Sequence, residues 1–224
     1  MSETDYSCDF MKPLDLVCEA DPRNAGTYPE FIGGGQRKID LFHERISKYS
    51  LSEPIPVEVR IHYETAKNIY LYSWFVFRFF NVAEHQALTS LELGLKELYK
   101  DELPEKVGLS RRLRHAKMHG HIKREDFELY RHRVWLSARE RYWSEKHLEM
   151  DEKGLESIIL DDSEVVVTDD DHFDYLDAKI KRICDFRNDY AHGSKDLYEG
   201  VLHTFEFVSE TLNSAYRRKY GQSA

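Results

Sequence analysis

Apolar residues recur at every third or fourth position along most of this chain. The spacing is clear in residues 57–80, 83–100, 110–119 and 124–149. It is found again on both sides of residues 187–193. A period of three to four residues indicates a helix with one buried face. The pattern therefore predicts an all-α fold, organised as a helical bundle.

The first 55 residues lack this regular spacing. Prolines and a run of three glycines interrupt them, and only residues 38–49 form a short amphipathic stretch. Proline and glycine both interrupt helices and strands. We interpret residues 1–55 as an irregular N-terminal extension that packs on the body, and residues 56–224 as one helical domain.

Local signals place some of the expected boundaries. Ser110 stands where a side-chain oxygen can cap the first turn of the 110–119 helix, and Gly120 can end that helix. The run over residues 69–77 is strongly apolar and aromatic, but Arg78 interrupts it well before the roughly 20 residues that a membrane span needs. We interpret the run as part of a buried helix, in the domain core or at a subunit interface, and expect no membrane segment.

One segment breaks the helical pattern within an insertion at about residues 150–172. Its centre holds three consecutive valines, residues 165–167, and carboxylate side chains flank them on both sides. Valine favours strands, whereas a dense run of acidic residues favours a solvated loop. We expect an acidic loop here, with room for one short strand.

Length and composition limit the architecture and the compartment. A chain of 224 residues can bury one core, or at most two. Its three cysteines are an odd number without the spacing of a metal site, and the N-terminus has none of the marks of a signal peptide. These features favour a reducing compartment, so we expect a cytoplasmic protein.

Charge is unevenly distributed along a chain that is acidic overall. The 41 Asp and Glu residues outnumber the 32 Lys and Arg residues, which gives a net charge of −9. Between residues 106 and 146, however, basic residues exceed acidic ones, and Arg111, Arg112 and Arg114 lie together there. Such a face can follow a phosphate backbone. The alternative is a solvated helix whose charges pair with the acidic loop, and the sequence favours neither.

The residues best suited to chemistry lie at positions 187–193, Arg-Asn-Asp-Tyr-Ala-His-Gly. Arg187 stays cationic and can fork onto a phosphate, whereas His192 can take and give protons near neutral pH. The same spacing recurs between Arg114 and His119. Only the pair Arg187 and His192 lies between two expected helices, because an apolar stripe precedes Arg187 and a helical pattern follows His192.

In this setting the residues resemble the HEPN superfamily, small helical domains whose nuclease members carry Arg, a polar residue, a few further positions and His. Arg187, Asn188 and His192 match that pattern closely, and the helical layout over about residues 57–218 matches it loosely. The resemblance implies a metal-independent endoribonuclease that works as a homodimer without a cofactor. Arg187 would hold the phosphate and His192 would transfer protons. Asn188 would orient the histidine or contact the phosphate.

The resemblance also implies a toxin or an antiviral defence effector, with RNA as substrate and an antitoxin or another protein as partner. Tyr190 could stack on a base. Contacts with the RNA backbone are expected from Arg111, Arg112 and Arg114. Two features depart from the family pattern. Ser194 replaces the tyrosine found two places after the histidine in adenylylated HEPN toxins, and the acidic insertion is not part of the minimal domain.

Structural explanations compete with each of these roles. Arg187 and His192 could be a salt-linked pair that joins two helices. Asn188 could be a helix cap, and Tyr190 a packed aromatic residue. The whole domain could also be a non-catalytic HEPN-like dimerisation or protein-binding module, which recruits its partner through the acidic loop or the aromatic helix. A non-catalytic RNA-binding protein is a further alternative.

Other sites are less favoured by the sequence. His115 and His119 stand one helical turn apart near His121, but no convincing anionic ligand completes a zinc site. The cluster at residues 169–172 could bind a divalent cation, although acidic loops are usually solvated. The glycines at residues 33–35 lack the lysine and hydroxyl residue of a phosphate loop, and no serine or cysteine nucleophile motif is found. We therefore expect no metal site and no nucleotide triphosphatase.

Overall fold

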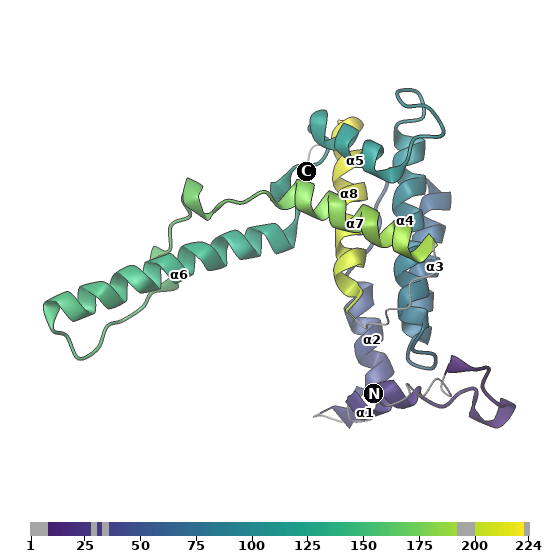
Figure 1. The fold of residues 1–224 in the computed structure, drawn as a ribbon, viewed down its shortest axis with the longest axis horizontal. Coiled ribbons are helices and arrows are strands. Elements are labelled where there is room, and N and C mark those ends of the chain that lie inside the picture. The colour runs from purple at the N-terminus through teal and green to yellow at the C-terminus, as the bar shows by residue number, and fades with distance from the viewer. Residues whose placement is uncertain (1–8, 28–30, 33–35, 192–199, 222–224) are drawn as a thin grey trace. The chain divides into compact units, whose positions relative to one another are not determined.

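The fold is almost entirely helical. The computed structural model describes residues 9–27, 31–32, 36–191 and 200–221 of the chain. Figure 1 shows its helices, α1 (Pro22–Thr27), α2 (Lys38–Ser47), α3 (Val57–Tyr72), α4 (Phe79–Leu98), α5 (Leu109–Met118), α6 (Glu128–Lys153), α7 (Tyr175–Ala191) and α8 (Leu202–Lys219). Two short strands, β1 (Phe31–Ile32) and β2 (Gln36–Arg37), pair antiparallel. The all-α fold expected from the hydrophobic spacing is confirmed.

The chain divides into two compact units. The first, which we call the body, contains residues 1–122 and 181–224. The second, which we call the α6 unit, contains residues 123–180. Helix α7 contributes residues to both units, and its second half belongs to the body. The hydrophobic pattern of the sequence marks no boundary at these positions.

The core of the body lies where α3, α4 and α8 pack together. Their buried faces carry the apolar residues that recur at helical spacing, among them Tyr63 and Phe205, both fully buried. Gly94 of α4 permits a close approach, because a Cβ there would come within 2.6 Å of a Leu212 side-chain carbon on α8. The missing side chain at Gly94 therefore sets the spacing between these two helices.

Helices α3 and α4 are separate, which corrects the expected continuous helix over residues 57–80. Turns occupy residues 73–78. At this junction Tyr70 and Phe80 pack against Phe42 of α2, with ring centroids 5.5 and 5.8 Å apart. The aromatic run therefore contributes to the core of the body. No helix in the described part of the chain combines the length and the apolar character needed to cross a membrane.

The N-terminal segment forms the hydrogen bonds that the turn between α3 and α4 needs. The Asn24 side chain donates to the carbonyls of Ser73 and Trp74 at 2.7 and 3.1 Å. Asp21 accepts the backbone N–H of Phe77 at 3.0 Å. Asp21 and Asn24 are fully buried. This contact between distant parts of the sequence therefore stabilises the break between the two helices.

Helix α5 starts one residue earlier than expected. Its N-cap is Gly108, so Ser110 lies inside the first turn and the predicted serine cap is wrong. Gly120 follows the helix with φ 68°, the left-handed conformation that glycine adopts readily. The predicted end of this helix at Gly120 is confirmed.

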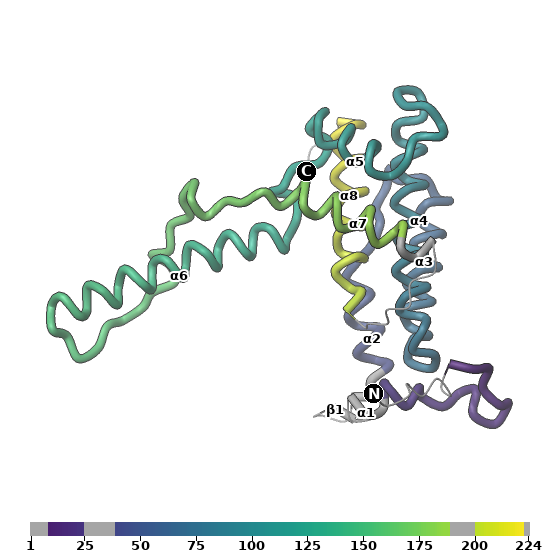
Figure 2. The backbone as a smooth tube through the Cα atoms, viewed as in Figure 1, coloured from purple at the N-terminus to yellow at the C-terminus, as the bar shows by residue number. Residues whose placement is uncertain are grey.

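The α6 unit consists of one long helix and a chain that returns along it, as Figure 2 shows. Helix α6 ends at Gly154, which has φ 61°. Residues 155–174, all of which the structure describes, contain two single-turn 3-10 helices and no strand, so the valines at 165–167 do not form the short strand considered above. The helix buries one residue at every fourth position: Tyr130, Val134, Ala138 and Tyr142.

Candidate functional site

Arg187 lies near the C-terminal end of α7, one turn after the buried Ile183. Its Nε and Nη2 atoms donate hydrogen bonds of 3.2 and 3.1 Å to Oε2 of Glu92 on α4. The Arg187 and Glu92 side chains are 39% and 28% exposed, so the pair is accessible to solvent. Ile183 and Arg187 share one side of α7 because they are four residues apart. Burial of the apolar stripe therefore places Arg187 beside α4.

Among the described residues, Glu92 engages only one edge of the Arg187 guanidinium. Glu92 accepts from Nε and Nη2, whereas Nη1 has no hydrogen-bond partner among the described residues. A guanidinium can donate from more than one edge, so a phosphate oxygen can bind at Nη1 while Glu92 holds the other side. Sequence reasoning missed Glu92, because nothing in the local pattern of α4 distinguishes it from other helical glutamates.

Helix α5 adds polar groups to the same part of the body. The Cys184 thiol, one turn before Arg187, is half-buried, and its burial raises its pKa. A hydrogen bond with Ser110 and the charge of Arg114 lower that pKa, and the charge of Glu92 raises it. These influences require the groups to lie close to Cys184. Glu92 of α4 and Ser110 and Arg114 of α5 therefore lie close to Cys184 of α7.

Arg112 does not contribute to this surface. Its side chain is almost completely buried and donates hydrogen bonds of 2.9 to 3.3 Å to three carbonyls of the loop between α4 and α5. Arg112 therefore stabilises that loop, which corrects the expectation that it contacts RNA. Its neighbours Arg111 and Arg114 are exposed. The helical phase of α5 points Arg112 inward and Arg111 and Arg114 outward, because neighbouring residues of a helix point in different directions.

The remaining residues of the 187–193 motif are placed only in part. Asn188 is exposed on α7. The backbone of Tyr190 belongs to α7, but its side chain lies outside the described part of the chain, as do His192 and Ser194. The pairing of Arg187 with His192 therefore stays a prediction from the sequence.

The same arginine and histidine spacing at Arg114 and His119 lies on α5, where a histidine cluster forms at the end of the helix. The ring centroids of His115 and His119 are 4.1 Å apart, and those of His119 and His121 are 6.0 Å apart. His115 Nε2 lies 2.7 Å from Oε2 of Glu102. The Tyr99 hydroxyl lies 2.9 Å from Nδ1 of His121. The structure thus brings the three histidines together, beside one carboxylate.

This cluster is not arranged as a metal site. Among the described residues here, no three ligand atoms lie within 4.8 Å of one another. Glu102 accepts from the Lys219 ammonium of α8 and interacts with His115, and these contacts lower the pKa of Glu102 to about 2. Burial and the charge of Lys219 lower the pKa of His121. The cluster therefore joins α5 to the end of α8 through a charged carboxylate.

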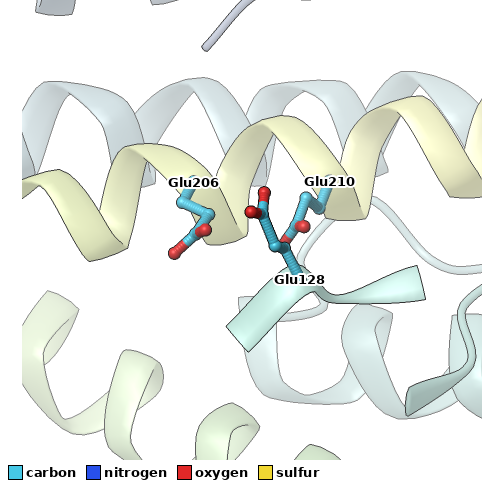
Figure 3. A group of neighbouring side chains, drawn as sticks. All are labelled: Glu128, Glu206 and Glu210. Atoms are coloured by element: carbon cyan, nitrogen blue, oxygen red, sulfur yellow. The ribbon is translucent and has the colours of Figure 1, made fainter. Parts of the chain in front are cut away.

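Helix α8 carries two further carboxylates that the sequence did not single out. Glu206 and Glu210 lie one turn apart, and both are half-buried. Figure 3 shows them together with Glu128, the first residue of α6. Glu128 belongs to the other unit, so only the α8 pair is a feature of the body. Two neighbouring carboxylates do not by themselves supply the six to eight oxygen ligands that Ca²⁺ takes.

The basic residues of α6 are paired with the acidic segment. Ion pairs with N–O distances of 2.8, 3.0 and 3.5 Å join Arg139 to Asp162, Arg141 to Asp171, and Lys146 to Glu164. At these three positions the structure agrees with the alternative in which helix charges pair with the acidic loop. Within the cluster at residues 169–172, Asp171 is the buried carboxylate and pairs with Arg141.

Comparison of the chain with protein-family models, with curated proteins and with solved structures finds no match. The HEPN resemblance therefore rests on the residues of the chain itself.

Proposed function

We propose that this chain is a HEPN-like endoribonuclease that cuts RNA without a metal and works as a homodimer. The observation that supports the proposal is the setting of Arg187. Its guanidinium is oriented on one side by Glu92 and is accessible to solvent, and the charge of Arg114 acts on Cys184, one turn before Arg187. A cation that is held in place before the ligand arrives is suited to stabilise phosphate charge.

Cleavage uses the 2′-hydroxyl of RNA as the nucleophile. A base removes the hydroxyl proton, the oxygen attacks the adjacent phosphorus in line, and the departing 5′-oxygen receives a proton from an acid. We assign proton transfer to His192 and stabilisation of the negative charge on the phosphate oxygens to Arg187. Asn188 orients the histidine or contacts the phosphate. One histidine cannot easily perform both transfers at once, so the partner protomer supplies the second histidine.

The wider role follows the resemblance. The resemblance implies a toxin or an antiviral defence effector, with RNA as substrate and an antitoxin or another protein as partner, and we propose that it acts in the cytoplasm. Tyr190 is assigned as a stacking platform for a base. Arg111 and Arg114, both exposed on α5, are assigned to the RNA backbone.

Cleavage of a labelled total-RNA pool in EDTA tests the proposal. The parent protein is compared with His192→Ala, Arg187→Ala and the control His147→Ala, since His147 is an exposed histidine of α6. The parent and the control should cut RNA, and the other two should lose roughly 100-fold or more in rate. Mass measured in parallel should correspond to a dimer. Cutting by His192→Ala at the parental rate, or no cutting by the parent, overturns the proposal.

The alternative is a HEPN-like dimerisation or protein-binding module without catalysis. The ion pair of Arg187 with Glu92 favours it, because a guanidinium bound to a carboxylate can serve as a link between two helices. Glu92→Gln separates the two functions. In a nuclease, kcat should fall because Arg187 loses its orientation, while RNA binding is kept. In a structural module, no variant cuts RNA and only stability changes.

A further inference from the structure

The acidic segment, residues 155–174, lies against α6 while several of its apolar side chains face solvent. Ile159 is 89% exposed and Val166 is 69% exposed. Within residues 155–174, all of which the structure describes, only Asp171 is buried. A segment held by hydrophobic burial shows the reverse pattern, with its branched aliphatic residues inside. Apolar packing, as between Phe173 and Tyr130 of α6 with ring centroids 5.4 Å apart, is therefore only part of what holds this segment on the helix.

Charged and hydrogen-bonding groups hold the part that we call the acidic strap, residues 161–172. It makes the three ion pairs with α6 described above. In addition, Arg141 donates to the Val166 carbonyl at 2.8 Å, and the Tyr142 hydroxyl donates to Glu164 at 2.9 Å. Partly exposed ion pairs of this kind are weak individually and are screened by salt. The strap is therefore a contact that another anion can replace.

The strap meets a face of α6 with the chemistry of a single-stranded nucleic-acid site. The Arg139 guanidinium carbon lies 3.9 Å from the Trp143 ring centroid and 5.3 Å from that of Trp135. The Lys146 ammonium lies 5.6 Å from the Tyr142 ring centroid. Proteins that bind single strands combine cations, which contact phosphates, with aromatic rings, which stack on bases. Helix α6 interleaves both kinds of side chain along one side.

We propose that this face of α6, made by Trp135, Arg139, Trp143 and Lys146, binds single-stranded RNA, and that the acidic strap competes for it. The strap carboxylates occupy the positions at the cations that RNA phosphates would take. The choice of RNA as the anion rests on the proposed function. The surface is separate from the proposed nuclease site, because it lies in the α6 unit and Arg187 lies in the body.

Binding of a labelled single-stranded oligouridine, measured by fluorescence anisotropy at an ionic strength of about 0.15 M, tests the inference. All proteins carry His192→Ala so that bound RNA is not cut. The strap variant is Asp162→Asn with Glu164→Gln. Its control, Asp151→Asn with Glu152→Gln, makes the same change in net charge at exposed positions outside the strap.

Competition by the strap predicts a large difference between these two variants. The strap variant should bind roughly fivefold or more tightly than the parent, with a steeper dependence on salt because more phosphate contacts form. The control should stay within about twofold of the parent, because distant exposed charges are screened. An equal gain in both variants attributes the effect to net charge and overturns the inference. No gain in the strap variant overturns it as well.

Removing the α6 cations in the strap variant locates the gain. Arg139→Gln with Lys146→Gln should abolish it, and persistence of tight binding places the RNA elsewhere and overturns the inference. Circular dichroism of each protein should match the parent, since the changes are at the surface. The outcome is separable from the nuclease proposal. If the strap variant binds RNA more tightly but the proteins that retain His192 do not cut RNA, the α6 surface is supported and the nuclease proposal is rejected. If the proteins that retain His192 cut RNA but the strap variant does not bind more tightly, the nuclease proposal is supported and the α6 surface is rejected.

Discussion

The body and the α6 unit are both helical, but different forces hold their parts together. In the body, α3, α4 and α8 remove side chains such as Leu91 and Phe205 completely from solvent. In the α6 unit, the strap leaves Val166 exposed and contacts the helix through ion pairs. Apolar burial does not depend on screening, whereas exposed ion pairs do. The difference indicates a permanent core in one region and a replaceable contact in the other.

The largest expected effect is in the core of the body. Phe205 lies between Tyr63 and Tyr70, with ring centroids 5.8 and 5.9 Å away. Phe205→Ala should lower the free energy of unfolding by about 4 kcal/mol, because it removes buried surface and leaves a cavity. Urea denaturation measures the loss. Val82→Ala, at a position 48% exposed, should cost less than about 0.5 kcal/mol. Similar losses in both variants would contradict a core centred on Phe205.

A smaller loss is expected where α4 and α8 approach most closely. Gly94→Ser introduces a Cβ that meets buried carbons of Leu212 and Val59 at 2.6 and 3.2 Å. The free energy of unfolding should fall by about 2 kcal/mol through overpacking. Gly108→Ser is the matched control, because no atom lies within 4 Å of its added Cβ and serine is a good N-cap. An unchanged Gly94→Ser protein would show that α8 can shift away without loss.

Glu92→Gln should lower the free energy of unfolding by less than about 1 kcal/mol, because the ion pair of Glu92 with Arg187 is partly exposed. The loss should shrink further in high salt, since screening weakens the pair in the parent. Thermal unfolding at two salt concentrations measures both effects. A loss of several kcal/mol that persists in salt would mean that the pair is a structural link, and would favour the non-catalytic module.

The smallest effect on the stability of the whole chain is expected at the strap. The Thr168 backbone N–H and the Arg141 guanidinium both bond to Asp171 and lower its pKa to about 2. Because this pKa lies below the ordinary value of 3.8, the contribution of Asp171 is complete above about pH 4 and is lost as the pH falls toward 2. NMR titration of the Asp171 carboxyl carbon measures this pKa.

Arg141→Gln tests how much the contact with α6 contributes to the lowered pKa of Asp171. The pKa of Asp171 should rise only part of the way to 3.8, because the larger influence, the hydrogen bond from Thr168, remains. The unfolding midpoint of the body at pH 7 should stay unchanged, since the α6 unit contains both residues. Titration of Asp171 at its ordinary pKa in the parent protein would mean that the strap is not docked in solution.

Much of the helical layout could be predicted because it depends on nearby residues. The stripe of α7 and the end of α5 at Gly120 follow from rules that act within one or two turns. The break between α3 and α4 could not be predicted in this way. The bonds that stabilise it come from Asp21 and Asn24, about 50 residues earlier in the chain. The division into two units escaped prediction for the same reason, because it depends on which helices pack together.

For the candidate site, the sequence by itself determined which residues carry useful chemistry and where they stand on their helices. The charge of Arg187 and its phase on α7 are examples. Only the tertiary structure decided that Glu92 holds this guanidinium, that Arg112 is turned inward, and that the cations of α6 meet the carboxylates of the strap. Side-chain type and helical phase are local properties. Burial and ion pairing depend on segments that are distant in the sequence and become neighbours only when the chain packs.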